Sequence, residues 1–287
     1  MKKTSSSEII NVTKSYLPSL EEYISEISIL WENHYLTNYG ELNDKLVNNL
    51  KKYLKTDKLH YVSNGTLALQ LAIDALDIQY GEIITTPFTF IATITSILWQ
   101  RCKPVFVDIN RKDFNIDVTK IEEKITSNTK CILAVHCFGF PCDIVNIEKI
   151  AKKYNLKIIY DAAHSFGTKI NGKSILKYGD ISCCSFHATK VFHTVEGGLC
   201  VVNSKKINEK LEAIKNYGIK DGKFEYIGIN AKNSEFHAAM GICVLKHIDE
   251  IIKIRKHKYE LYKKKLSSKV YIPQLPQNFK HNYIYYY

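Results

Sequence analysis

Short apolar runs alternate with helical segments along most of this chain. Leucines recur every fourth residue from Leu42 to Leu54, which predicts one face of an amphipathic helix. Seven strands are then predicted, at His60–Val62, Glu82–Thr85, Val105–Asp108, Cys131–His136, Lys157–Tyr160, Ile181–Phe186 and Leu199–Val202. Helices are predicted between most of them, at Leu67–Leu76, Ile91–Trp99, Val118–Ile125, Ile144–Tyr154 and Lys206–Asn216, and a last helical pattern runs from Ser234 to about Leu266. Such alternation indicates an α/β fold in which crossover helices cover a mostly parallel sheet.

The composition limits the class of protein. The chain has 287 residues, of which 45% are hydrophobic and 24% are charged. These proportions are typical of a soluble globular protein and exclude collagen-like, low-complexity and wholly disordered classes. The residues after Met1 lack the apolar core of a signal peptide, and there is no apolar run of about 18 residues that could span a membrane. Eight cysteines in no regular framework favour a reducing compartment, so we predict a cytoplasmic protein without membrane contact.

Two features suggest other kinds of partner. Cys137 and Cys142 beside His136 come closest to a set of metal ligands, but buried thiols within or after a strand are the favoured interpretation, and we predict no metal. The chain carries 40 lysines and arginines against 29 acidic residues, a net charge of +11 that raises nucleic-acid binding as an alternative. Outside Arg255–Lys265 these charges are scattered, and no nucleic-acid-binding motif occurs. We therefore predict no nucleic-acid partner.

The segment Gly167–Ser174 matches the nucleotide-binding P-loop pattern letter for letter. A working P-loop needs a strand before it and a long helix after it. Asn171-Gly172 is instead the favoured pair for a tight hairpin turn, with Thr168–Ile170 and Lys173–Ile175 on either side. The sequence therefore predicts a β-hairpin here and no ATP hydrolysis.

Three kinds of functional group stand at predicted strand ends, where ligands bind in open α/β sheets. Asp161 directly follows one apolar strand, and Lys190 closely follows another. Gly65-Thr66 opens a helix whose free N–H groups and positive dipole end suit a phosphate. A lysine for a covalent bond, a carboxylate for the pyridine nitrogen and a phosphate cradle are the parts that a pyridoxal phosphate (PLP) enzyme requires.

With these motifs, the chain resembles the DegT/DnrJ/EryC1/StrS family of PLP-dependent nucleotide-sugar aminotransferases. The matching stretches occur in family order and cover nearly the whole chain: Ser63–Leu69, Pro87–Thr93, Pro104–Asp108, Asp161–His164, Ser185–Lys190, Glu196–Gly198 and Asn230–Ala239. Tyr35–Gly40 and Ser185–Phe192 look most like the branch that forms dTDP-4-amino-4,6-dideoxyhexoses. The resemblance implies PLP-dependent transferase fold type I, similar to aspartate aminotransferase, with a mostly parallel seven-stranded sheet between helices.

The resemblance also implies roles for residues around the cofactor. Lys190 would bind the cofactor covalently and shuttle a proton between the substrate carbon and the cofactor. Asp161 would pair with the pyridine nitrogen, the alternative being a helix cap. His164 would lie against the ring or near its phenolic oxygen, with a structural hydrogen bond as the alternative, and Phe90 would stack on the ring unless it is simply a core residue.

Other implied roles concern the phosphate and the substrates. The phosphate is expected to be bound within one chain by Gly65, Thr66 and Ser185. Asn230 would reach it from a neighbouring subunit, which implies a homodimer with shared active sites. A further group is expected to face the substrate: Asn38, His187, His193 and Glu196.

The implied reaction transfers an amino group from L-glutamate to the keto carbon of a nucleotide-linked keto-deoxy sugar. The favoured substrate is a dTDP-4-keto-6-deoxyhexose, and such sugars feed O-antigen, capsule or glycan synthesis. Some members of the family are sugar dehydratases in which histidine replaces the cofactor-binding lysine. The presence of Lys190 argues against that branch.

The chain departs from the family pattern in two places. Lys232 stands where an arginine is common, and the chain ends at Tyr287, where the family usually continues through a small C-terminal domain in which His281–Tyr283 would begin a strand. We therefore expect a large PLP-binding α/β domain at residues 1–250, including an N-terminal segment 1–40, and the start of an apparently truncated small domain at 251–287. The alternative to an active transaminase is a truncated homologue that binds PLP without full transaminase activity.

Overall fold

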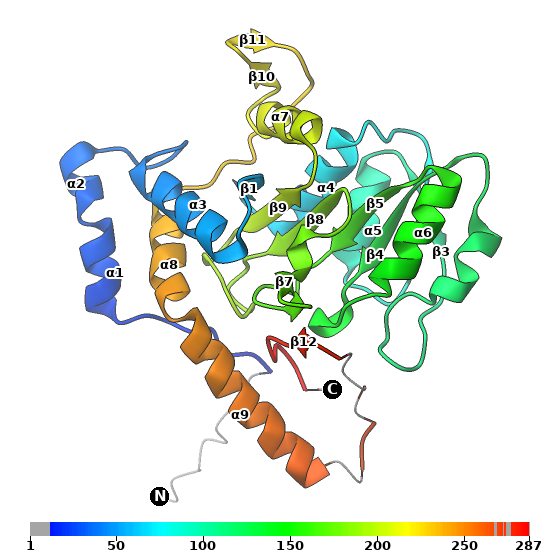
Figure 1. The fold of residues 1–287 in the computed structure, drawn as a ribbon. Coiled ribbons are helices and arrows are strands. Elements are labelled where there is room, and N and C mark those ends of the chain that lie inside the picture. The colour runs from blue at the N-terminus through cyan, green and yellow to red at the C-terminus, as the bar shows by residue number, and fades with distance from the viewer. Residues whose placement is uncertain (1–11, 267–268, 272, 274–276, 287) are drawn as a thin grey trace, which may run out of the picture.

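A seven-stranded sheet forms the centre of the molecule (Figure 1). The computed structural model describes residues 12–266, 269–271, 273 and 277–286. The strands of the sheet, in the order β1-β9-β8-β5-β4-β2-β3, are β1 (Leu59–Val62), β9 (Gly198–Val202), β8 (Ile181–Ser185), β5 (Lys157–Asp161), β4 (Thr129–Val135), β2 (Glu82–Thr85) and β3 (Lys103–Phe106). β9 pairs antiparallel with β1 and β8, whereas the other neighbouring strands pair in parallel. The predicted α/β fold with a mostly parallel seven-stranded sheet is confirmed.

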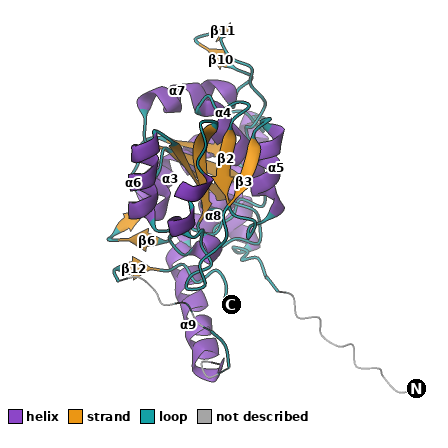
Figure 2. Ribbon diagram, turned by 90° about the vertical axis from the view of Figure 1, so that its right-hand side faces the viewer, coloured by secondary structure: helices purple, strands orange, loops and turns teal. Residues whose placement is uncertain are grey.

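Helices cover both faces of this sheet, as Figure 2 shows for α5 and α6 on opposite sides. One face carries α4 (Gly65–Ala75), α5 (Ile91–Trp99) and α7 (Lys205–Ile214), and the other carries α3 (Glu41–Leu54), α6 (Ile144–Tyr154) and α8 (Glu235–Lys246). Successive strand residues alternate between two hydrophobic cores: in β5, Ile158 and Tyr160 pack with α3 and α6, and Ile159 packs with α4. Because both faces are covered, the central strand β4 is apolar and buried on both faces from Cys131 to Val135.

The leucine repeat forms the buried face of α3, which confirms the predicted amphipathic helix. The N terminus of this helix is capped by a side chain from α8. The backbone N–H groups of Leu42 and Asn43 donate to the carboxylate of Glu235 at 2.7 and 3.2 Å. Only 1% of Glu235 is exposed, and a Cβ at Gly40 would collide with its carboxyl group. Because Gly40 has no side chain, the Glu235 carboxylate fits against the start of α3, and α3 begins in close contact with α8.

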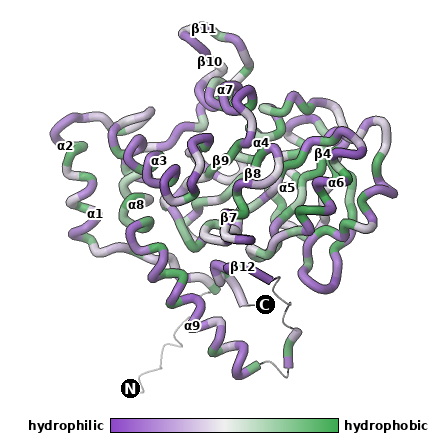
Figure 3. Tube along the Cα trace, in the orientation of Figure 1, coloured by the Kyte–Doolittle hydropathy of each residue, from purple (hydrophilic) through white to green (hydrophobic). Residues whose placement is uncertain are grey.

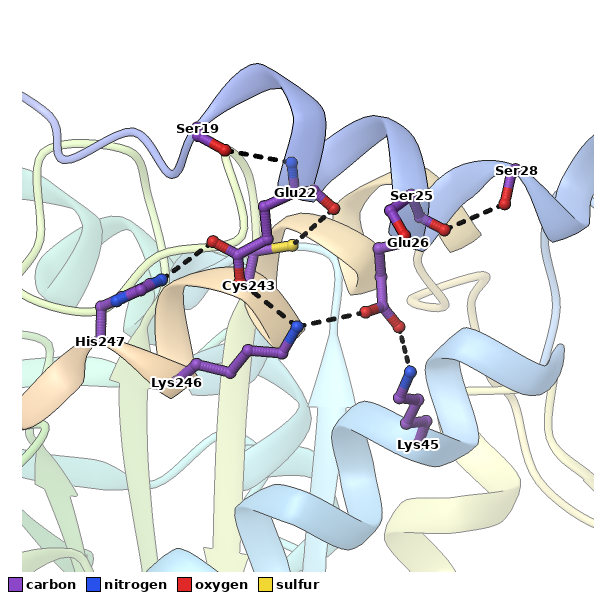
Figure 4. Close-up of polar contacts among 9 residues, drawn as sticks. All are labelled: Ser19, Glu22, Ser25, Glu26, Ser28, Lys45, Cys243, Lys246 and His247. Atoms are coloured by element: carbon purple, nitrogen blue, oxygen red, sulfur yellow. Dashed lines mark hydrogen bonds and ion pairs between the residues drawn. The ribbon is translucent and has the colours of Figure 1, made fainter.

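Ion pairs fasten the N-terminal helix α1 (Leu20–Ile27), which is followed by the short helix α2 (Ile29–Asn33), to the rest of the molecule (Figure 4). Glu22 of α1 pairs with His247 at 2.9 Å and with Lys246 at 3.2 Å. Glu26 pairs with Lys246 at 3.5 Å and with Lys45 of α3. These two carboxylates therefore join α1 to both α8 and α3.

The predicted helix Val118–Ile125 is wrong. Two short 3-10 helices occupy this segment, η1 (Val118–Lys120) and η2 (Glu122–Lys124). Ile121 between them is fully buried and anchors the segment to the core. The backbone N–H groups of Ile121 and Ile125 donate to the carbonyls three residues before them, at 3.3 and 3.2 Å, which is the 3-10 pattern.

The helical pattern predicted from Ser234 to about Leu266 is confirmed, and the structure divides this stretch into two helices. α8 ends at Lys246, and α9 (Ile248–Leu266) begins after His247, whose ring is held by Glu22. α9 projects from the body of the molecule (Figure 1), and many of its residues are hydrophilic (Figure 3). The predicted basic character of this segment therefore belongs mainly to a projecting helix.

The strand predicted at Val105–Asp108 lies two residues earlier, as β3. It pairs with β2 in the register that joins Glu82 to Lys103 and Thr85 to Phe106. Pro104 within β3 has no N–H to donate, and β3 tolerates it because it is an edge strand.

The predicted hairpin is confirmed as β6 (Lys169–Ile170) and β7 (Lys173–Ser174). Asn171 and Gly172 form its turn with φ values of 50° and 75°. The 3-10 helix η4 (Ile175–Lys177) follows, in place of the long helix that a P-loop needs. An unpredicted second hairpin joins β10 (Ile219–Lys220) to β11 (Lys223–Phe224).

The strand predicted to begin at His281–Tyr283 is wrong. The C-terminal strand β12 (Phe279–Lys280) comes just before this segment and pairs antiparallel with β6. After β12 the chain no longer pairs with β6. The side-chain amide of Asn282 instead donates to the carbonyls of His164 and Phe166 at 2.7 and 2.9 Å. The C-terminal residues are thereby fixed against the end of β5.

The eight cysteine thiols are all buried and free, which confirms the interpretation of Cys137 and Cys142 as buried thiols. In the part of the chain that the structure describes, no group of three His, Cys, Asp or Glu side chains is arranged to hold a metal ion. Among the same residues, no helix has both the length and the apolar surface that are needed to cross a lipid bilayer.

Candidate active site

A cavity of about 740 Å³ opens at the carboxyl ends of the parallel strands β4, β5 and β8. The N terminus of α4 and the residues that lead into α5 complete its walls. Nine residues that the sequence singled out line it: Gly65, Thr66, Phe90, Asp161, His164, Ser185, His187, Lys190 and Glu196. The parallel sheet therefore collects at one edge the groups that are far apart in the sequence.

Lys190 lies in a turn after β8, where its backbone N–H donates to the carbonyl of His187 at 2.9 Å. Burial lowers the pKa of its amine, while the neighbouring Asp161 and Cys184 oppose this shift. Among the described residues, none forms an ion pair with the Lys190 Nζ. A partly buried amine of this kind is suited to act as a nucleophile and to exchange protons.

Asp161 is a buried carboxylate held by uncharged donors. Its Oδ2 accepts from Thr93 Oγ1 at 2.7 Å, and its Oδ1 accepts from the backbone N–H of Ala163 at 3.1 Å. Burial raises the pKa of Asp161 against the effects of these two hydrogen bonds and of the charge on Lys190. No helix begins after Asp161, so it is not a helix cap. A buried carboxylate without a bonded cation fits the protonated pyridine nitrogen of PLP.

The start of α4 and the end of β8 form a cradle for an anion. Asn64 caps the helix by accepting from the backbone N–H of Leu67 at 2.8 Å. The N–H groups of the first turn of a helix lack intrahelical partners and attract anions. A Cβ at Gly65 would lie 3.0 Å from Cβ and 3.4 Å from Oγ of Ser185, so the backbone and this hydroxyl meet closely. The geometry of Gly65, Thr66 and Ser185 fits a bound phosphate.

His164 is held among aromatic rings at the cavity wall. Its ring is parallel to that of Phe138, with centroids 6.2 Å apart, and it meets Tyr285 edge to face at 5.3 Å. Burial, followed by the charge of Lys190, lowers the pKa of His164 to about 3, so the imidazole is neutral at pH 7. The structure shows no side-chain hydrogen bond of His164 among the described residues, which favours the predicted place beside a cofactor ring over a structural hydrogen bond.

Phe90 immediately precedes α5 at the mouth of the cavity, and 76% of the residue is exposed. It is therefore not a core residue, which was the alternative to a stacking role. An aromatic face left open at the wall of a cavity is suited to cover a planar ring.

Asn38 and Asn230 lie outside this cavity. Asn230 is exposed and forms an isolated antiparallel bridge with Asn216, and its Oδ1 accepts from the backbone N–H of Lys232 at 3.3 Å. Asn38 is exposed, and its carbonyl accepts from the hydroxyl of Tyr35 at 2.7 Å. The structure thus separates these two residues from the other nine within one chain.

His193 does not face the cavity, contrary to the prediction. Its Nδ1 accepts from the backbone N–H of Val195 at 3.2 Å, and its Nε2 therefore donates to the carbonyl of Tyr16 at 2.7 Å. The residue is buried. His193 instead ties the N-terminal segment to the loop between β8 and β9.

Two residues that shape the site, one behind Asp161 and one at the cavity wall, were not singled out from the sequence. Thr93 lies in the first turn of α5 and fixes Asp161, and its place in the motif stretch Pro87–Thr93 could have drawn attention to it. Tyr285 reaches the cavity because the C-terminal residues fold back over β5. No local sequence pattern predicts that the C-terminal residues fold back over β5.

The sheet order and the cavity at the strand ends are those of an α/β enzyme. The lysine, the carboxylate and the anion cradle within this cavity place it in the aminotransferase class. The chain belongs to the DegT/DnrJ/EryC1/StrS aminotransferase family, whose sequence model matches residues 19–287. The predicted family and class of enzyme are confirmed.

Similar proteins agree with this assignment. A dTDP-4-amino-4,6-dideoxy-D-glucose transaminase of Shigella dysenteriae is 47% identical over 258 residues, which cover 90% of this chain and 70% of that protein. A transaminase of the same name from Escherichia coli is 39% identical, with 97% of this chain and 75% of the relative covered. Among solved structures, DesI with its TDP-sugar product has a TM-score of 0.90 at 27% identity, over 96% of this chain and 71% of DesI.

Proposed function

We propose that the protein is a PLP-dependent aminotransferase that transfers the amino group of L-glutamate to the keto carbon of a dTDP-4-keto-6-deoxyhexose. The product would serve O-antigen, capsule or glycan synthesis in the cytoplasm. The observation that carries this proposal is the presence of Lys190 and Asp161 in one cavity, beside an anion cradle. The names of the relatives at 47% and 39% identity support the choice of sugar nucleotide.

The residues around the cavity would each contribute to this reaction. PLP supplies an electron sink that stabilises negative charge on a substrate carbon when it is bound. The Asp161 carboxylate would hold a proton on the pyridine nitrogen, and Thr93 keeps that carboxylate oriented. The N terminus of α4 and Ser185 would bind the phosphate, and Phe90 would cover the ring.

Lys190 would attach the cofactor and then move protons through its Nζ. A lowered pKa leaves a larger fraction of this amine neutral near pH 7, and only the neutral form can accept a proton from a substrate carbon. The neutral His164 can contact the cofactor ring without adding a second positive charge beside Lys190.

We also propose a homodimer in which each subunit completes the site of its partner. Asn230 and Asn38 lie outside the cavity of their own chain and are exposed, which suits contacts made across an interface. On α5, next to the cavity mouth, Ile91, Leu98 and Trp99 are 62%, 55% and 75% exposed. Large apolar side chains exposed together are typical of a surface that a partner covers.

Spectroscopy with PLP tests this proposal. We expect the protein to bind PLP with a new absorbance band, and borohydride reduction followed by peptide mapping to place the cofactor on Lys190. Lys190→Ala should abolish the band, whereas Lys206→Ala, at an exposed position of α7, should retain it. A band that survives in Lys190→Ala, or a cofactor mapped to another lysine, would contradict the assignment.

A further inference from the structure

A histidine and a carboxylate face each other at the rim of the cavity, outside the chemistry described above. His187 Nε2 lies 3.6 Å from Glu196 Oε1, and their side chains are 48% and 55% exposed. The other ring nitrogen, Nδ1, accepts from the backbone N–H of Thr189 at 3.3 Å and lies 2.9 Å from the Thr189 hydroxyl. Because Nδ1 is an acceptor, the proton of the neutral ring is on Nε2 and points to Glu196.

The backbone fixes Glu196 at this place. Its carbonyl accepts from Thr194 Oγ1 at 2.7 Å and from Asn233 Nδ2 at 3.0 Å. The preceding Val195 has a φ of 66°, which is a rare conformation for a β-branched residue. Such conformations persist only where surrounding contacts impose them, and they concentrate at functional sites. A Cβ at Gly197 would collide with Thr194 Oγ1, so the position after Glu196 has no room for a side chain.

The charge of Glu196 indicates which substrate it meets. A carboxylate accepts hydrogen bonds from hydroxyl groups and repels anions at short range. L-Glutamate carries two carboxylates and no hydroxyl group, whereas a deoxyhexose ring carries hydroxyls beside its keto carbon. The diphosphate of the sugar nucleotide is attached at carbon 1, across the ring from carbon 4. The rim position therefore suits the sugar ring and does not suit the amino donor.

We propose that Glu196, supported by His187, binds hydroxyl groups of the sugar ring and so positions its keto carbon in the cavity, and that the pair has no part in the reaction with the amino donor. This inference rests on the proposed function and specifies the sugar part of the same site. Glu196 is the contacting residue, and His187 is a positioning residue that acts through it.

Separate measurement of the two half-reactions tests the proposal. In Glu196→Ala holoenzyme, we expect the conversion of the PLP band by L-glutamate to stay within about two-fold of wild type. The second-order rate constant for recovery of the band with dTDP-4-keto-6-deoxy-D-glucose should fall by roughly 10- to 100-fold, the loss of a hydrogen bond to a charged group. Glu196→Gln keeps an acceptor oxygen and should lose less. Glu225→Gln, an exposed carboxylate away from the cavity, should match wild type in both half-reactions.

Calorimetry provides a readout that does not depend on turnover. Glu196→Ala should weaken the binding of dTDP-D-glucose, which has no keto group to react, and leave the binding of dTDP unchanged. An equal loss in the L-glutamate half-reaction, or unchanged constants for the sugar in Glu196→Ala, would overturn the proposal. Wild-type protein that binds no PLP would instead refute the proposed function, so the two failures are distinguishable.

Discussion

At the scale of single residues, burial sets the chemistry of the site. Burial raises the pKa of Asp161 and lowers the pKa of Lys190, and each opposes the shift of the other through its charge. Both groups are thereby held closer to neutrality than exposed side chains would be. A positively charged pyridine ring would supply the partner that Asp161 lacks, which makes cofactor binding and the ionisation of Asp161 favour each other.

Replacement of Thr93 tests how far Asp161 depends on its hydroxyl neighbour. Thr93→Val removes the 2.7 Å hydrogen bond to Asp161 with little change of shape. Because the donor stabilises the charged carboxylate, we expect the affinity for PLP to fall about ten-fold in equilibrium dialysis. Thr119→Val, which removes a 2.7 Å hydrogen bond from an exposed threonine to Asp117 away from the cavity, is the control. An unchanged affinity in Thr93→Val would show that Asp161 is oriented without it.

Nine of the residues that line the cavity were predicted from the sequence. Gly65, Thr66, Asp161 and Lys190 followed from their places at strand ends, and the other five followed from the resemblance to a known family. The sequence did not predict that Glu196 faces His187, or that Thr93 holds Asp161. Thr93 lies in α5 and Asp161 in β5. His187 and Glu196 lie nine residues apart in the loop between β8 and β9, so both contacts depend on the three-dimensional path of the chain. His193 illustrates the same limit, because its partner is the distant carbonyl of Tyr16.

At the scale of elements, α3 depends on a cap supplied by another helix. Glu235 accepts from two N–H groups at the start of α3 and is almost fully buried. A side-chain cap from α8 therefore couples the formation of these two helices. It also fixes the chain around Asn38, just before α3.

Removal of this cap should destabilise the fold. Glu235→Ala leaves the N–H groups of Leu42 and Asn43 without their acceptor, so we expect the free energy of unfolding in urea to fall by about 2 kcal/mol. Glu235→Gln keeps an acceptor and should lose less. Glu123→Ala, at an exposed position, should change it by less than about 0.5 kcal/mol. Equal stability of Glu235→Ala and wild type would mean that water replaces the cap.

Periodicity predicted the elements whose apolar pattern is long and regular. The leucine repeat of α3 and the apolar strands are of this kind, and the structure has them close to the predicted bounds. The segment Val118–Ile125 has too few residues for its spacing to distinguish an α-helix from two 3-10 turns. The break at His247 follows no helix-breaking residue in the sequence and instead accompanies a tertiary ion pair with Glu22.

At the scale of the whole molecule, the positions of Asn38 and Asn230 have the largest consequence. Both lie away from the cavity of their own chain, and in the proposed homodimer they would reach the site of the partner. The net charge of +11 needs no nucleic-acid partner in this account. The projecting helix α9 carries seven of the 40 lysines and arginines, and the anions expected at the site are a phosphate and a sugar diphosphate.

Complementation between two inactive variants tests the shared site. Asn230→Ala and Lys190→Ala should each lower transamination strongly as separate homodimers. After subunit exchange in an equal mixture, about a quarter of all sites should combine an intact Lys190 with an intact Asn230 and recover activity. A mixture no more active than its components would contradict a site built from two subunits.

Transamination itself is the most direct test of the central claim. The holoenzyme should be incubated with L-glutamate and dTDP-4-keto-6-deoxy-D-glucose, and both products should be followed by mass spectrometry. The account predicts equal amounts of 2-oxoglutarate and a dTDP-linked amino sugar, and neither product with Lys190→Ala. A protein that carries PLP on Lys190 yet leaves dTDP-, UDP- and GDP-linked keto sugars unchanged would contradict it.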